Sequence, residues 1–270
     1  MAEPLIRYKD VEVHQQDLCV LNEVNLELQK GEFVYLIGKV GSGKTSLLKT
    51  LYGELDITAG EAMVLGYDMS RIKRKHIPQL RRKLGIVFQD FQLLTDRTVN
   101  DNLAFVLKAT GWKNKSEIKD RIAEVLMQVG MGNKGYKFPN ELSGGEQQRI
   151  VIARAMLNSP EIILADEPTG NLDAETGRAI VGLLHNISRT GGSLVLMTTH
   201  NLHLLHEFPG QVYRCAGHQI TDVTSEYSNV MPTVEETNNN QTTESNQTTE
   251  NSQVQNNNCL LYTSPSPRDL

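Results

Sequence analysis

The sequence is poor in cysteine, in long apolar runs and in net positive charge, and each shortage narrows the class of protein. Its three cysteines are an odd number and form no C-x-x-C pair, which argues against a disulfide framework or a structural zinc site. No apolar run reaches the ~18 residues of a membrane-spanning helix, and the start of the chain shows no signal pattern. A net charge of −5 gives no general reason to expect nucleic-acid binding. We therefore expect a cytoplasmic protein that crosses no membrane by itself but can dock on one.

The composition changes near residue 229 and divides the chain. Over the whole chain, 39% hydrophobic and 22% charged residues are typical of a globular protein, and 270 residues suffice for one large domain or two small ones. We expect one folded domain over residues 1–228. Residues 229–258 are dominated by Asn, Gln, Thr, Ser and Glu, so they cannot bury enough apolar surface to fold, and we expect disorder there. Residues 259–270 shift abruptly again and resemble a non-native scar.

The most informative stretch of the sequence is rich in glycine and lies between an apolar run and a predicted helix. It reads Gly38-Lys39-Val40-Gly41-Ser42-Gly43-Lys44-Thr45 and matches the spacing G-x-x-x-x-G-K-[ST] of a phosphate-binding loop. Its glycines let the backbone approach a polyphosphate, and its amides and the following helix start point positive dipoles at the phosphates. Lys44 adds a full charge, and the Thr45 hydroxyl is suited to bind Mg²⁺. The sequence therefore predicts a nucleotide site at residues 38–46, with Ser46 completing the loop.

Apolar strands alternate with helices along most of the chain, as in a parallel sheet covered on both faces. Residues 5–13 and 20–28 alternate in polarity and predict a half-buried antiparallel ribbon. We expect strands at 33–37, 61–65, 84–88, 162–165 and 194–197, and two short ones at 211–215 and 218–223. Helices are expected at 46–52, 78–83, 98–130, 143–158 and 174–189.

Polar side chains stand at the carboxyl ends of three of these strands, where sheets of this kind bind ligands. Asp166 and Glu167 follow one strand, so Asp166 would hold Mg²⁺, directly or through water, and Glu167 would polarise the attacking water. Gln89 would ligate Mg²⁺ and contact the same water, and His200 would contact the γ-phosphate and support Glu167. Alone each is weak evidence, but together with the phosphate loop they predict an ATP- and Mg²⁺-dependent NTPase.

A second potential anion cradle lies far from the phosphate loop in the sequence. Ser143, Gly144 and Gly145 begin a predicted helix within Leu142-Ser143-Gly144-Gly145-Glu146-Gln147-Gln148-Arg149. Two cradles but one lysine loop are explained most simply by a head-to-tail homodimer, in which each cradle closes over the nucleotide of the other chain.

These motifs together resemble the nucleotide-binding domain of ABC transporters over roughly residues 4–225. The resemblance implies an α/β P-loop NTPase fold with a parallel-sheet core, an antiparallel β subdomain and a helical subdomain of about residues 92–158. It assigns family roles to positions of this chain: Walker A to 38–45, Q-loop to Gln89, signature to 142–149, Walker B to 162–167, D-loop to 171–173 and H-loop to His200. It also implies ATP hydrolysis by a dimer that sandwiches two ATP molecules.

One position departs from the family pattern. The family usually places an aromatic residue before the second strand to stack on adenine, and His14 is the matching residue here. Because imidazole stacks less well than a tyrosine ring, the resemblance implies weaker base selectivity at His14.

Within the family, residues 88–102, 138–142 and 165–173 are similar to the FtsE group of cell-division ATPases. That similarity implies an FtsX-like integral membrane partner, docking on the cytoplasmic face of the inner membrane, and control of cell-wall hydrolysis. Relatives that release lipoproteins or expel macrolides share the run Glu-Pro-Thr-Gly-Asn-Leu-Asp, so such an exporter ATPase stays open as an alternative. A soluble regulatory ATPase acting on nucleic acid or ribosomes is a more distant alternative, since the chain is acidic and has no long coiled-coil insertion.

Overall fold

The computed structural model describes residues 3–228, so the predicted polar tail (229–258) and the predicted scar (259–270) lie outside the described residues. The strands are β1 (Ile6–Gln15), β2 (Leu18–Leu28), β3 (Phe33–Ile37), β4 (Ile57–Val64), β5 (Tyr67–Asp68), β6 (Leu84–Val87), β7 (Ile162–Asp166), β8 (Leu194–Thr199), β9 (Gln211–Ala216) and β10 (Gln219–Asp222). The α-helices are α1 (Lys44–Leu51), α2 (Ile77–Arg82), α3 (Val99–Ala109), α4 (Lys115–Gln128), α5 (Gly144–Met156), α6 (Ala174–Gly191), α7 (His203–Glu207) and α8 (Thr224–Ser228). Two 3₁₀ turns, η1 (Arg74–His76) and η2 (Pro139–Glu141), complete the elements. None of the helices in this part of the chain combines the length and the apolar character needed to span a bilayer.

The larger sheet has six strands in the order β10-β9-β3-β8-β7-β6. All neighbours from β9 to β6 pair in parallel, and β10 is an antiparallel edge strand. Its central strands β3 and β8 are buried along their whole length, as expected for strands covered on both faces. Because β3, β6, β7 and β8 run in parallel, their carboxyl ends meet at one edge, and the predicted functional residues follow these ends.

The smaller sheet is antiparallel, with the order β2-β1-β4-β5. The β1–β2 pairing runs from Ile6 opposite Leu28 to Gln15 opposite Leu18, which confirms the predicted antiparallel ribbon. Buried and exposed residues alternate along much of both strands because one face packs on the core and the other faces solvent.

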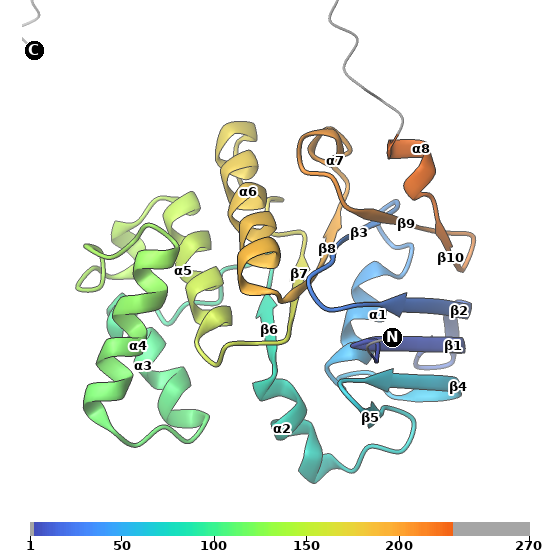
Figure 1. Ribbon diagram of the computed structural model, residues 1–270, viewed down its shortest axis with the longest axis horizontal. Helices are drawn as coiled ribbons and strands as arrows, with labels where there is room; N and C mark the ends of the chain where they lie inside the picture. The colour runs from blue at the N-terminus through green and yellow to red at the C-terminus, as the bar shows by residue number, and fades with distance from the viewer. Residues whose placement is uncertain (1–2, 229–270) are drawn as a thin grey trace, which may run out of the picture. The chain divides into compact units, whose positions relative to one another are not determined.

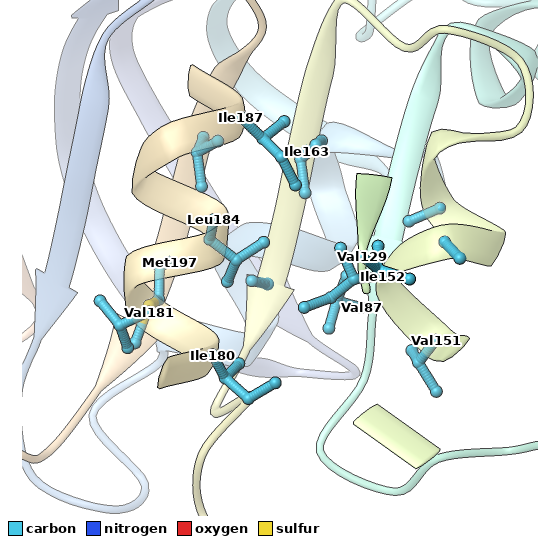
Figure 2. Close-up of a cluster of buried hydrophobic side chains, with 14 of the residues drawn as sticks. Val87, Val129, Val151, Ile152, Ile163, Ile180, Val181, Leu184, Ile187 and Met197 are labelled. Atoms are coloured by element: carbon cyan, nitrogen blue, oxygen red, sulfur yellow. The ribbon is translucent and has the colours of Figure 1, made fainter. Parts of the chain in front are cut away.

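Two hydrophobic clusters cover the two faces of the larger sheet. On one face, side chains of the sheet pack against α3, α4, α5 and α6, as Figure 2 shows for Val87, Ile163 and Met197 against helical residues such as Ile152 and Leu184. On the other face, alternate residues of the same strands pack against α1 and the smaller sheet. Figure 1 shows this order of layers. The predicted α/β P-loop fold, with its parallel-sheet core, is confirmed.

One predicted helix is wrong as a single element. The stretch expected to be helical over residues 98–130 forms two helices, α3 and α4, separated by residues 110–114. Gly111 lies in the left-handed region at φ +102°, and Asn114 caps α4 by accepting the Ser116 amide. The apolar stripe continues through both helices, so the pattern alone did not show the break. Thr98 caps α3 in the same way, through the Asp101 amide at 3.2 Å.

Candidate active site

The phosphate loop connects β3 to α1 and is shaped by two glycines that tolerate no side chain. Gly43 has φ +103°, and a Cβ there would lie 2.8 Å from Val20 Cγ1. A Cβ on Gly38 would collide with the carbonyl oxygen of Cys215. Among residues 3–228, no side chain caps the start of α1, so its first amides remain available to an anion.

Lys44, the lysine of the loop, is buried although it carries a charge. Its Nζ donates hydrogen bonds to the carbonyl oxygens of Gly38 at 2.8 Å and Lys39 at 3.1 Å. It also lies 3.9 Å from Oε1 of Glu167. These bonds hold the ammonium over the loop, where a bound polyphosphate would contact it.

Glu167 stands one residue beyond β7 in a strained backbone conformation. Its φ of +47° is in the left-handed region, which non-glycine residues rarely adopt. The Glu167 amide donates to Thr198 Oγ1 at 2.8 Å, and Thr198 Oγ1 donates to Asp166 Oδ1 at 2.7 Å. One fully buried hydroxyl on β8 therefore orients both acidic residues. Thr198 was not among the predicted site residues, although its position near the end of a buried strand, two residues before His200, was a usable signal.

His200 holds the other side of the Glu167 carboxylate. Its Nδ1 lies 2.7 Å from Glu167 Oε2, and because an ionised carboxylate only accepts, the imidazole donates through Nδ1–H. The His200 side chain is 65% exposed and that of Glu167 only 15%, so the imidazole stands over the carboxylate at the mouth of the site. Lys44 and His200 thus flank one carboxylate from two directions.

Gln89 follows β6 and is positioned by the segment after Glu167. The side-chain amide of Asn171 donates to the Gln89 carbonyl oxygen at 3.3 Å. A Cβ on Gly170 would lie 3.0 Å from Gln89 Nε2, so the absence of a side chain at 170 leaves room for the glutamine. These contacts connect the predicted Q-loop to the predicted D-loop.

A cavity of about 630 Å³ joins these elements. The predicted site residues that line it are Val40, Gly41, Ser42, Gly43, Lys44, Thr45, Ser46, Gln89, Glu167 and His200. Gly38 and Lys39 do not line the cavity but contribute the carbonyl oxygens that hold Lys44. Asp166 does not line it either; its carboxylate accepts from Thr198, the same hydroxyl that accepts the amide of Glu167. The structure thus brings together residues from four strand ends that are up to 160 positions apart in the chain, from Val40 to His200.

The structure places His14 away from this cavity. The cavity wall on the side of the β1–β2 hairpin is formed by Gln15, Leu18 and Val20, together with His218. His14 instead pairs with Glu12, whose Oε2 lies 2.9 Å from its Nε2. Because successive side chains of a strand point to opposite faces, Gln15 faces the cavity and His14 faces away. His14 therefore does not line the cavity in this structure, and the base contact expected of it stays a prediction.

The predicted second cradle does not line the cavity of its own chain. Ser143 caps α5 by accepting the Glu146 amide at 3.3 Å, and the Glu146 carboxylate accepts the Ser143 amide at 2.9 Å. This bond from the backbone, with the contribution of Lys134, holds the pKa of Glu146 below its usual value. A Cβ on Gly145 would collide with Cγ2 of Thr176 on α6. In the isolated chain, the start of α5 is capped by Ser143 and packs closely against α6 at Gly145. These residues do not contact the nucleotide cavity of their own chain.

The oxygen atoms at the site suit a hard divalent cation. Thr45 and Gln89 line the cavity, and the carboxylate of Asp166 is held in place by Thr198. Hydroxyl, amide and carboxylate oxygens are ligands that Mg²⁺ prefers. Ser42 Oγ is buried and has no hydrogen-bond partner among the described residues, as expected of a loop whose partner is a ligand. The residues present therefore fit a Mg²⁺–nucleotide.

Comparison with known proteins agrees with this geometry. The sequence model of the family described as "ABC transporter" matches residues 21–170. The chain is 43% identical over 203 residues to "Cell division ATP-binding protein FtsE" of Streptococcus pneumoniae serotype 2, covering 75% of this chain and 87% of the relative. It is 48% identical over 185 residues to the protein of the same name from Mycobacterium tuberculosis, covering 68% and 80%.

Among solved structures, the fold is similar to "Dimeric structure of a post-hydrolysis state of the ATP-binding cassette MJ0796 bound to ADP and Pi". The TM-score is 0.70 at 31% identity, over 80% of this chain and 96% of the other. That protein is thus an ATP-binding cassette seen as a dimer with its hydrolysis products.

Proposed function

The chain belongs to the ABC transporter family as an FtsE-like ATPase subunit, and from this premise we propose that it drives an FtsX-like integral membrane partner during cell division. The output would be mechanical control of cell-wall hydrolysis at the septum. The similarity to relatives named "Cell division ATP-binding protein FtsE" supports the cell-division role. The observation that carries the ATPase chemistry is the restraint of one carboxylate, Glu167, by His200 and Lys44 at the mouth of a nucleotide-sized cavity.

ATP is the substrate in this proposal. The phosphates would lie on the free amides of α1 and on Lys44, which exchanges its carbonyl contacts for phosphate oxygens. Thr45, Gln89 and Asp166 would hold Mg²⁺, which, when bound, neutralises charge that develops on the phosphates.

Glu167 would act as the general base. Its carboxylate accepts a proton from the attacking water, while His200 donates to its second oxygen and keeps the first free to face the water. The strained backbone at Glu167 and the Thr198 bond to its amide fix where that oxygen points. Gln89, which lines the same cavity, would help to orient the water.

The active species would be a head-to-tail homodimer. Ser143, Gly144 and Gly145 do not line the cavity of their own chain, so they would cap the γ-phosphate bound to the partner chain. The dimeric state of the similar ATP-binding cassette MJ0796 supports this arrangement. ATP would thus close the dimer, and hydrolysis would open it.

The membrane partner would contact the surface that follows Gln89 and the exposed face of α3. Leu94 and Phe105 are exposed there, and the Arg97 guanidinium lies 5.0 Å from the Phe105 ring centroid. Movement of Gln89 on nucleotide binding would therefore reach the partner directly. In this proposal the protein docks on the cytoplasmic face of the inner membrane and binds no nucleic acid.

Identification of the partner tests the proposal. Tagged Glu167→Gln protein would be purified with ATP from gently solubilised native membranes, with Lys44→Ala as a matched control that lacks the phosphate contact. An FtsX-like protein recovered with Glu167→Gln, and reduced with Lys44→Ala, is the expected result. A lipoprotein- or drug-export permease instead would move the function to transport, and a folded, ATP-bound bait without a membrane partner would favour a soluble regulator.

A further inference from the structure

The β1–β2 hairpin brings together three side chains that the proposed ATPase does not use. Glu12 and His14 lie two positions apart on β1, and Cys19 on β2 is the direct cross-strand partner of His14. The ligand atoms of these three residues all lie within 4.8 Å of one another. The grouping arises from strand pairing, which is why the spacing of cysteines in the sequence gave no sign of it.

The cluster lies on the opposite face of the hairpin from the nucleotide cavity. Gln15 pairs with Leu18, and both line the cavity, whereas the neighbouring pair His14 and Cys19 does not. Side chains alternate between the faces of a strand, so the two sets point in opposite directions across a sheet one residue thick. The cluster is therefore separate from the predicted Mg²⁺ ligands.

We propose that Glu12, His14 and Cys19 form a binding site for a transition-metal ion of the Zn²⁺ class. A thiolate, an imidazole nitrogen and a carboxylate oxygen are the three ligand types that proteins offer to Zn²⁺, whereas Mg²⁺ and Ca²⁺ prefer oxygen alone. Ligand atoms of one tetrahedral zinc ion lie roughly 3.4–3.8 Å apart given bond lengths of about 2.0–2.3 Å. The cluster needs only small side-chain movements to reach that spacing.

The present contacts of the three side chains are ones that a metal ion would replace. Glu12 Oε2 lies 2.9 Å from His14 Nε2, so both ligand atoms already face one point. The Cys19 thiol donates to the Leu21 carbonyl oxygen at 3.4 Å, a hydrogen bond that is lost when the sulfur gives up its proton to bind a metal ion. The side chains of His14 and Glu12 are 30% and 40% exposed, so an ion reaches them without unfolding of the core. A fourth position remains for water or a small ligand.

Occupancy would clamp the end of the hairpin. The ion would join β1 to β2 beside the turn at Gln16 and Asp17, next to the pair Gln15 and Leu18 that forms the cavity wall. Binding to the folded hairpin alone would raise the unfolding temperature of the protein. The site would thus link metal supply to the rigidity of the wall beside the nucleotide.

Cobalt titration of the reduced, nucleotide-free full chain tests the site. Cys259, which lies outside the described residues, would first be replaced by serine so that it offers no competing thiol. We expect one Co²⁺ per chain with thiolate-to-cobalt absorption, displaced by Zn²⁺, and a rise in unfolding temperature with Zn²⁺. Cys19→Ser should abolish the thiolate absorption, and Glu12→Gln should weaken Zn²⁺ binding by about tenfold or more.

Cys215→Ser is the matched control, because that cysteine is buried and bonds to the Ser42 carbonyl instead. It should leave the cobalt spectrum unchanged. The proposal is overturned if the parent protein gives no thiolate absorption at micromolar Co²⁺, or if the absorption survives Cys19→Ser. Since no nucleotide is present, either result is independent of the ATPase assignment.

Discussion

Thr198 fixes the backbone of Glu167, because its Oγ1 accepts the Glu167 amide hydrogen at 2.8 Å. The same hydroxyl donates to Asp166 at 2.7 Å, and it is completely buried. A left-handed backbone at a non-glycine residue costs about 1–3 kcal/mol and persists only where its surroundings impose it. The Thr198 bond is part of what imposes it at Glu167, so Thr198 acts as a positioning residue for the proposed base.

Replacement of Thr198 by valine should separate positioning from binding. Thr198→Val keeps the shape of the side chain but leaves the Glu167 amide and Asp166 without their partner, so kcat should fall about tenfold or more while ATP affinity changes little. The free energy of unfolding should fall by about 1–3 kcal/mol. Thr198→Ser, which restores the hydroxyl, should recover most of kcat. Equal activity of the valine and serine variants would show that the hydroxyl has no positioning role.

Replacement of Glu167 by glutamine should remove the base and keep the site. The amide oxygen still accepts from His200, but it cannot take a proton, so hydrolysis should fall by about 10² to 10⁴ while ATP binding and ATP-dependent dimerisation persist. Steady-state phosphate release and size-exclusion chromatography with ATP measure the two effects. Glu161→Gln is the matched control, since Glu161 pairs with Lys83 just before β7 begins, at the far end of that strand. Undiminished hydrolysis by Glu167→Gln would refute the role of the base.

The sequence was most informative where one residue type at a fixed spacing has a single physical explanation. The strand–loop–helix around Lys44 and the apolar strands before Asp166 and His200 predicted the parallel sheet and the convergence of their ends. Sequence patterns were less informative where contacts between distant segments decide the end of a helix or the role of a side chain. The break between α3 and α4 lies inside a continuous apolar stripe. The role of the Thr198 hydroxyl becomes visible only when the pairing of β7 with β8 places it beside Asp166 and Glu167. Only the register of β1 and β2 shows which face of the hairpin His14 occupies, so its position outside the cavity could not be predicted from the sequence.

A double substitution should show whether Gly145 is required for packing. Gly145→Ala should lower the free energy of unfolding by about 1–3 kcal/mol, because the new methyl group collides with Cγ2 of Thr176. Thr176→Ser removes that methyl but keeps the hydroxyl that donates to Asp173 at 2.6 Å, so the double variant should recover most of the loss. Chemical denaturation of the four proteins measures the coupling. Additive effects would show that the collision is not the cause.

The capping box of α5 should contribute stability that depends on pH. The bond from the Ser143 amide lowers the pKa of Glu146 in the folded state, so its ionised form stabilises the fold above the unfolded pKa of about 4.3. That contribution should be lost as the pH falls through the lower folded pKa. Glu146→Gln keeps an acceptor without the charge. It should therefore unfold at a lower temperature than the parent at pH 7, and the difference should shrink as the pH falls below the unfolded pKa. An unchanged difference would contradict the assignment.

The part of the cavity wall that Leu18 and Val20 form should limit how tightly the base is held. Leu18 is 65% exposed at the edge of the cavity, whereas His14 lies on the other face of the hairpin. In the Glu167→Gln background, with Mg²⁺ and without added transition metal, His14→Ala should leave the affinity for ATP within about twofold. Leu18→Tyr should increase it by about tenfold, because stacking of a base on an aromatic ring contributes roughly 1–3 kcal/mol. Equilibrium binding of ATP and GTP measures both affinity and selectivity. A loss of affinity in His14→Ala without a gain in Leu18→Tyr would show that His14 contacts the base. The β1–β2 hairpin would then have to change register when the nucleotide binds.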